Sequence, residues 1–249
     1  MRYLSAVTTP TIASRIERGI GHGRLRPLKA NDDLRSMGGE RFAGIIADHA
    51  AQLPLLRLGL PVILLVPLNR EGMRQFRIVA EDGIDVRLWA DGDDALSEMA
   101  LQALSGPRSP SPAAAIVDHL RGRYSDLVAD VLTACAILAT SRRSMDEIAR
   151  VCGASPSSVR GALRDAGLAS ISGVIARMRC LHALWAWESG RQNFWSYAGF
   201  RTLAELSAHL SQHTGSPLGR WKAQDGFQSL LQSIGSSLSQ QDEETAQVG

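Results

Sequence analysis

Two segments in the second half of the chain each combine two short helical patterns with a tight turn between them. The first covers residues 144–167, where Gly153 marks the turn and Ser155 is the N-cap of the following helix. The second covers residues 194–217, with Gly199 at its turn. Each segment predicts a helix-turn-helix unit. Two such units in one chain predict an all-α domain that can place a helix in each of two stretches of major groove.

The distribution of charge favours a polyanionic partner for the same part of the chain. Residues 1–106 contain thirteen basic and thirteen acidic side chains, whereas residues 107–222 contain fourteen basic and eight acidic ones. Residues 223–249 add four acids and no base. The positive excess therefore coincides with the helix-turn-helix patterns, as attraction to phosphate requires.

Composition also predicts where the domains begin and end. Residues 105–112 read Ser-Gly-Pro-Arg-Ser-Pro-Ser-Pro, a composition typical of a linker. The polar, acidic end of the chain predicts disorder. We therefore expect an α/β domain over 1–105, a linker over 106–115, an all-α domain over 116–234 and a disordered tail over 235–249.

The first domain alternates short apolar runs with amphipathic segments. The run Val62-Ile-Leu-Leu-Val66 predicts a central strand that is buried on both faces. Strands that alternate with helices predict a parallel, flavodoxin-like sheet covered on both faces. The expected strands are 3–8, 24–30, 42–47, 62–66 and 86–90, and the expected helices are 11–19, 31–37, 50–58, 70–82 and 93–104.

This order of elements resembles the receiver domains of response regulators. In that family a phosphate-accepting Asp follows the third strand, a position that Asp48 holds in this chain. The residues that would complete such a site are missing: Thr8-Thr9-Pro10 stand where an acidic pair would hold Mg²⁺, and Pro67 stands where Ser or Thr is expected. Asp48 is thus a candidate phosphoacceptor with little electrostatic support. We expect a degenerate receiver-like module for dimerisation or for sensing a protein or small molecule.

The second helix of the first helix-turn-helix unit has a clear inward face. Val159 and Leu163 lie four residues apart and are expected to pack inward, and Ser155 followed by Pro156 is a strong helix-start signal. The outward side chains suit DNA, because Arg can hydrogen-bond both acceptors of guanine and Ser can reach phosphate. The predicted DNA contacts of this unit are Ser155, Ser157, Ser158, Arg160 and Arg164.

A long helical pattern over residues 171–188 connects the two units. In the second unit, Leu203, Leu206 and Leu210 predict an inward apolar stripe. The predicted DNA contacts outside the first unit are Arg179 on the connecting helix and Arg201, Thr202, Glu205, His209 and Gln212 in the second unit.

Other residue types with chemical potential are interpreted as structural. Cys135, Cys152 and Cys180 lack the spacing of metal or redox sites and are expected to be core thiols. Trp185 and Trp187 are expected to pack in the core or between the helix-turn-helix units rather than to stack on nucleic acid. We predict no metal, no cofactor and no enzymatic activity.

The segment from about residue 126 to 222 resembles the DNA-binding domain of AraC-type transcription regulators. The residues that carry the resemblance are the run Ala154-Ser-Pro-Ser-Ser-Val-Arg160, then Leu163, Gly167, Arg179, Ala183, Gly199-Phe200, Leu206, Leu210, Thr214-Gly215 and Pro217. The resemblance implies seven helices, in which a long helix joins two helix-turn-helix units that enter successive major grooves about 34 Å apart. Members of the family usually activate transcription by contacting RNA polymerase, and many dimerise or sense a signal through their other domain.

The chain departs from the family pattern on its recognition helices. Gly161 and Ala162 stand where Arg is frequent, Trp195 stands where Ala is usual, and the second recognition helix has few bases and carries Glu205. We therefore expect the first unit to do most of the base reading.

These expectations combine into one functional prediction. The chain is expected to be a sequence-specific DNA-binding transcription regulator and activator that acts on double-stranded DNA as a homodimer, with RNA polymerase as a candidate partner. We expect it in the bacterial cytoplasm at the nucleoid, with no membrane partner. The alternative is a protein-interaction module that docks to a transcription factor or polymerase without binding DNA specifically.

Overall fold

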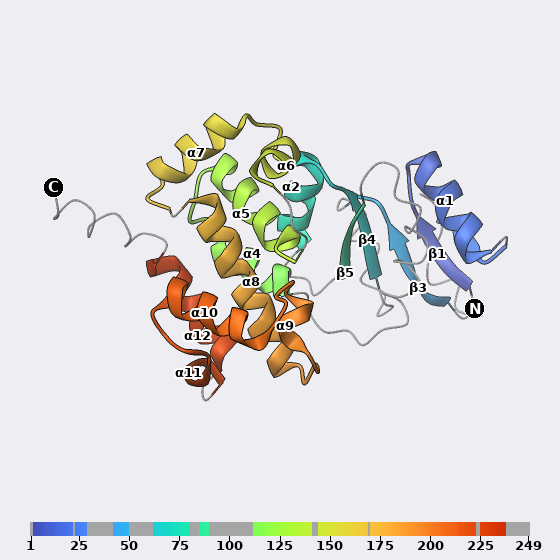
Figure 1. Cartoon of the computed structure of the whole chain (residues 1–249). Coiled ribbons are helices and arrows are strands. Elements are labelled where there is room, and N and C mark those ends of the chain that lie inside the picture. The colour runs from blue at the N-terminus through green and yellow to red at the C-terminus, as the bar shows by residue number, and fades with distance from the viewer. Residues whose placement is uncertain are drawn as a thin grey trace. The chain divides into compact units, whose positions relative to one another are not determined.

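The computed structural model (Figure 1) describes residues 2–21, 23–28, 42–49, 62–79, 85–89, 112–140, 144–168, 170–222 and 225–237. The chain divides into two units, Met1–Ser111 and Pro112–Gly249, and the division falls inside the predicted linker.

The first unit is built on a parallel sheet, as the alternating pattern predicts. The five strands lie in the order β2-β1-β3-β4-β5, and every neighbouring pair is parallel. Their bounds are β1 Arg2–Ala6, β2 Leu25–Pro27, β3 Phe42–Ala47, β4 Val62–Pro67 and β5 Asp85–Trp89, and the described helices are α1 Pro10–Ile20 and α2 Arg70–Val79.

Both faces of the sheet are apolar, because successive side chains of a strand point to opposite faces. On β3, Ile45 packs with one buried cluster and Ile46 with the other. α1 covers the Ile46 side with Ile12 and Ile16, whereas Val79 of α2 joins the opposite cluster. β3 and β4 are thus central strands buried on both sides, which explains their unbroken apolar runs.

Two predicted strands of this unit are longer than the observed ones. Strand β1 ends at Ala6 rather than at residue 8, since Thr8 turns to hydrogen-bond Asp48. Strand β2 ends at Pro27, and the following Leu28 N–H makes a last hydrogen bond to the Ser5 carbonyl of β1 at 2.7 Å. Residues 80–82 of the predicted helix 70–82 lie outside the described residues. The predicted helices 31–37, 50–58 and 93–104 lie outside the described residues.

The described part of the second unit is helical. Its helices are α4 Pro112–Leu120, α5 Asp126–Leu138, α6 Met145–Val151, α7 Pro156–Asp165, α8 Ile171–Glu188, α9 Phe194–Tyr197, α10 Leu203–Thr214, α11 Leu218–Lys222 and α12 Gly226–Ser237. Two predicted boundaries are wrong: residues 112–115 belong to α4 and not to the linker, and residues 235–237 belong to α12 and not to the tail. Burial stabilises both helices, through Ala113 and Ile116 in α4 and Phe227 and Leu230 in α12.

Helix α8 is the structural centre of this unit. It packs against α4, α5, α9, α10 and α12, and it runs between the pair α6–α7 and the pair α9–α10 (Figure 1). His182 of α8 donates through Nε2 to the Ala136 carbonyl of α5 at 2.7 Å. Burial lowers the pKa of His182 to about 4, so the ring is neutral at pH 7.

Three cysteines and two tryptophans of the second domain were expected to be packing residues. Cys135, Cys152 and Cys180 are buried thiols that are not joined in a disulfide, and burial raises the pKa of the Cys180 thiol to about 12. Trp185 is half-buried. Trp187 is 39% exposed and is therefore not a core residue, but its ring packs on Phe194 of the second helix-turn-helix unit at 5.0 Å, which agrees with the predicted inter-unit packing.

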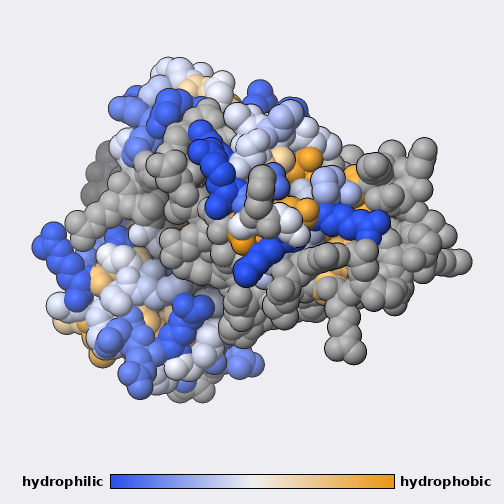
Figure 2. Space-filling view, turned by 90° about the vertical axis from the view of Figure 1, so that its right-hand side faces the viewer, coloured by the Kyte–Doolittle hydropathy of each residue, from blue (hydrophilic) through white to orange (hydrophobic). Residues whose placement is uncertain are grey.

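Large hydrophobic side chains are exposed at few of the described positions, namely Ile78, Trp187 and Leu203. On the face drawn in Figure 2, the described hydrophobic residues appear as small separate areas among hydrophilic ones. Among the described residues, no helix has both the length and the apolar character needed to cross a bilayer.

Candidate nucleic-acid interface

The turn between α6 and α7 is set by local capping. Ser144 begins α6 with a capping box, in which its Oγ accepts from the Glu147 N–H and Glu147 Oε2 accepts from the Ser144 N–H at 2.8 Å. At the other end, Gly153 takes a left-handed φ of 63°, and the Ala154 N–H donates to the Ala149 carbonyl at 2.9 Å. This closure ends α6 and sends the chain directly into α7.

The turn between α9 and α10 has the same construction. Gly199 has a φ of 77°, and the Phe200 N–H donates to the Trp195 carbonyl at 3.0 Å. A Cβ at Gly199 would lie 3.1 Å from the Thr140 carbonyl oxygen, so the close packing of this turn on the end of α5 adds a second requirement for glycine.

Helices α7 and α10 share one pattern relative to their caps. Ser155 caps α7 through its Oγ, and Thr202 caps α10 through its Oγ1, each accepting from the N–H three residues on. The fourth and eighth residues after each cap are buried, and they are Val159 and Leu163 in α7 and Leu206 and Leu210 in α10. The two helices are therefore equivalent in cap and in inward stripe. Each turns its opposite face to solvent.

The outer face of α7 presents most of the polar side chains that the sequence predicted as DNA contacts. Ser157, Ser158, Arg160 and Arg164 are exposed, and the cap residue Ser155 is exposed as well. Ser155 Oγ lies 2.8 Å from both Ser157 Oγ and Ser158 Oγ, which gathers three hydroxyls at the start of the helix. Arg164 contacts Asp165 at 3.4 Å, but both side chains are largely exposed, so this pair holds the arginine weakly.

The outer face of α10 is different in chemistry. Arg201, Thr202 and Gln212 are exposed, as predicted. Between them the exposed residues are small or apolar, namely Leu203, Ala204, Ala208 and Ser211. The prediction that Leu203 points inward is wrong, because it is 38% exposed and the buried stripe begins at Leu206.

Glu205 is a capping residue rather than a groove-facing one. Its Oε2 accepts from the Arg201 N–H at 2.7 Å, and its own N–H donates to Thr202 Oγ1. The hydrogen bond from the Arg201 N–H lowers the pKa of the Glu205 carboxyl. A carboxylate in the first turn also suits the positive end of the helix dipole, which accounts for an acid on this helix.

The Arg179 side chain points into the second helix-turn-helix unit, α9–α10, and not toward the outer face of that unit. Its Nε donates to the Ala198 carbonyl at 3.0 Å and its guanidinium to the Gly199 carbonyl at 2.7 Å, while the group lies 4.1 Å from the Phe200 ring centroid. His209 is half-buried against the same ring at 5.3 Å, so it too lies off the exposed face. Both predicted DNA contacts are thus corrected to packing residues.

A buried arginine that sequence reasoning missed holds the other end of α10. Arg177 of α8 donates from Nε to the His213 carbonyl at 3.2 Å, and burial lowers its pKa. A cation suits the negative end of the helix dipole. Arg177 therefore holds the C-terminal end of α10 to α8, and Arg179 holds the turn that precedes α10. Their spacing of two on a helix gave no signal of a shared role.

Asp48 in the first unit is fully engaged by its neighbours. It is 6% exposed at the end of β3, and both carboxylate oxygens accept from Thr8, through the N–H at 2.9 and 3.0 Å and through the hydroxyl. The Thr9 N–H adds a third donor at 2.8 Å. The carboxylate thus ties the end of β3 to the start of α1, an arrangement that does not support the predicted phosphoacceptor role.

Comparison of the chain with protein-family models, with curated proteins and with solved structures gave no match.

Proposed function

We propose that the chain is a DNA-binding transcription regulator of the AraC type, with α6–α7 and α9–α10 as its two helix-turn-helix units. The observation that carries the proposal is the equivalence of α7 and α10 in cap, buried stripe and preceding glycine turn, on either side of α8. Helices α5 to α11 supply the seven elements that the resemblance implies. Groove-reading helices with a solvent-facing side and a rigid support are the general requirement for this mode of recognition.

The two helix-turn-helix units are proposed to have unequal roles in DNA recognition. On α7 the outer face carries Arg160 and Arg164, which can reach base edges or phosphates. On α10 the outer face is small and uncharged over Ala204 and Ala208, so phosphate contact through Arg201 and Thr202 is its main contribution. The base-specific part of recognition therefore belongs to α7.

The first unit is proposed to be a receiver-like module that does not transfer phosphate. The order β2-β1-β3-β4-β5 is the flavodoxin-like order that receivers also have. With Asp48 held by Thr8 and Thr9, the module serves dimerisation or sensing rather than phosphorelay. Activation as a homodimer through contact with RNA polymerase, in a bacterial cytoplasm, completes the proposal.

A salt titration of binding to random-sequence duplex tests the proposal. A DNA-binding chain with several phosphate contacts gives a log–log slope on the order of −4 to −8. The second candidate function, a module that docks to another protein, is favoured by the uncharged outer face of α10. It predicts a slope near zero, and a slope near zero would overturn the DNA-binding proposal.

A further inference from the structure

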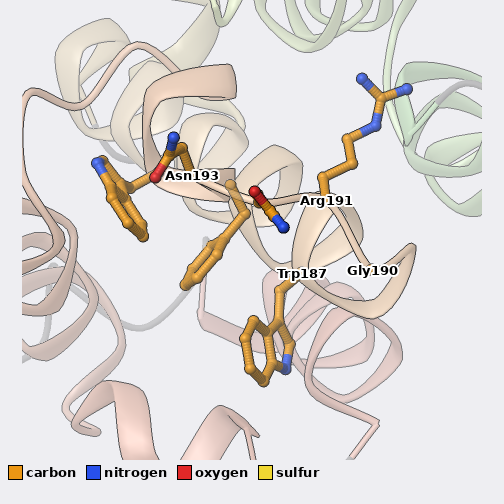
Figure 3. A pocket seen from close by; sticks show the side chains of 7 residues that line it. Trp187, Gly190, Arg191 and Asn193 are labelled. Carbon is orange, nitrogen blue, oxygen red and sulfur yellow. The ribbon is translucent and has the colours of Figure 1, made fainter.

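A pocket of about 470 Å³ lies where the end of α8 turns into α9. Its apolar wall is formed by Trp187, Phe194 and Trp195, and Arg191 and Asn193 line it from the connecting loop (Figure 3). Trp187 exposes 39% of its surface, although an indole of this size is normally covered. A concave aromatic wall beside polar groups is typical of a binding site.

One positive charge, that of Lys222, lies against this aromatic wall. Lys222 Nζ lies 4.0 Å from the Trp187 ring centroid and 4.9 Å from that of Phe194. The Arg191 guanidinium points away from Trp187 (Figure 3) and lies 4.6 Å from the ring centroid of Tyr197 in α9, which is not part of the pocket lining. Within the described ranges, neither cation forms an ion pair with a carboxylate. The pocket therefore suits a segment that combines an aliphatic side chain with acidic ones.

We propose that this pocket, the aromatic pocket, binds residues 238–249 of the same chain. That segment contains Asp242, Glu243 and Glu244, has no basic residue, and carries the aliphatic side chains of Leu238 and Val248. Its charge complements the rim of the pocket. Its single valine near the end supplies an apolar group of a size that the aromatic wall can cover.

The connection between α12 and the pocket makes this contact sterically accessible. The Phe227 N–H at the start of α12 donates at 2.8 Å to Oε1 of Glu188, the neighbour of Trp187. Helix α12 has twelve residues and so spans about 18 Å, which about six extended residues can retrace. Residues 238–243 suffice for the return. The acids then lie near Lys222, with the remaining residues over the pocket.

Tethering makes even a weak contact significant. A segment that is tethered near its binding site has an effective concentration on the order of 1 mM at that site. An intrinsic dissociation constant of similar size leaves the aromatic pocket about half occupied. Removal of the acidic charges should then raise the quenching of Trp187 by acrylamide by up to about twofold.

Fluorine NMR of the full chain labelled with 5-fluorotryptophan tests the proposal. The signals of Trp187 and Trp195 are assigned by replacing each with Phe. The variant D242N/E243Q/E244Q should shift the Trp187 and Trp195 signals and increase quenching at Trp187. The control D91N/D93N/D94N makes the same change of charge outside residues 238–249 and should leave both unchanged. Identical signals in the wild type and in both variants would overturn the proposal.

Two further experiments distinguish binding of the chain's own residues 238–249 from binding of the same residues of a second copy. A chain that ends at Ser237 should bind a synthetic peptide of residues 238–249 saturably, and a peptide with the three acids neutralised should bind at least several-fold more weakly. If the wild-type signals change with protein concentration, the occupant is the tail of a second copy, and the intramolecular proposal is overturned.

Discussion

The replacement of Arg179 by Ala separates a packing residue from a DNA-contacting one. In the wild type, the guanidinium makes two charge-assisted hydrogen bonds to the turn before α10, at 3.0 and 2.7 Å, and stacks on Phe200 at 4.1 Å. Hydrogen bonds to a charged group contribute about 1.5–3 kcal/mol each, and cation–π contact at a partly exposed site about 0.5–1 kcal/mol.

The sum must be reduced, because water can reach part of the turn after the side chain is removed. Gly199 is half-exposed, whereas Ala198 is buried and its carbonyl would stay without a partner. We therefore expect Arg179→Ala to lower the free energy of unfolding by about 2–4 kcal/mol. Arg179→Lys keeps the charge but not the planar fork, and should lose about half as much.

Urea unfolding followed by circular dichroism at 222 nm measures this loss, because the described second unit is helical. Arg160→Ala is the matched control: Arg160 is exposed, so its loss should change stability by less than about 0.5 kcal/mol. An Arg179→Ala variant that is as stable as the wild type but binds DNA more weakly would refute the reasoning. Such a result would mean that Arg179 lies on the outer face and contacts DNA.

Three other predictions follow from single sites. The pKa of His182 is about 4 in the fold and about 6.5 when unfolded, so the unfolded state binds more protons between these pH values and the free energy of unfolding should fall by about 3 kcal/mol as pH drops from 6.5 to 4. His182→Gln keeps a hydrogen-bond donor to the Ala136 carbonyl and should flatten this pH dependence in urea unfolding. Gly199→Ala should lower the free energy of unfolding by about 1–3 kcal/mol, because Gly199 has a φ of 77° and a Cβ there would press on the Thr140 carbonyl. Gly161→Ala, in open space within α7, should raise it by about 0.5–1 kcal/mol, and equal shifts of the melting temperature in the two variants would contradict this. Incubation with a small phosphoryl donor should add no phosphate to the chain by mass spectrometry, and a phosphate adduct that Asp48→Asn abolishes would contradict this prediction. Asp48→Asn should instead destabilise the first domain by about 1–3 kcal/mol, because the Asn amide group would face the N–H donors of Thr8 and Thr9.

Features with a local cause could be predicted from the sequence. Helix α8 begins and ends where its periodicity indicates, at Ile171 and Glu188. The caps Ser144 and Ser155 begin α6 and α7 because their hydroxyls satisfy N–H groups only three residues away. Strand β3 has the predicted bounds because its apolar run is buried on both faces.

Features that depend on contacts with residues distant in the sequence could not be predicted. Arg179 appeared to be on an outer face, yet its acceptors lie 19 and 20 residues further along the chain. Asp48 resembled a phosphoacceptor, but its donors come from a loop 39 and 40 residues earlier. Residues 112–115 resembled a linker because they follow directly on the Pro- and Ser-rich run of residues 105–112, whereas packing of α4 on α5, α8 and α12 keeps them helical. In each case a tertiary contact overrides the local signal.

Footprinting of the chain on a duplex selected from random sequence tests the central claim most directly. Two groove-reading helices on one support should protect two stretches of major groove on the same side of the duplex, centred about 10 base pairs apart. Arg160→Ala should relax base preference at one position in one stretch, at a cost of about 1–3 kcal/mol, and leave the other stretch protected. A single protected stretch, or protection that Arg160→Ala weakens equally for every sequence, would contradict the account.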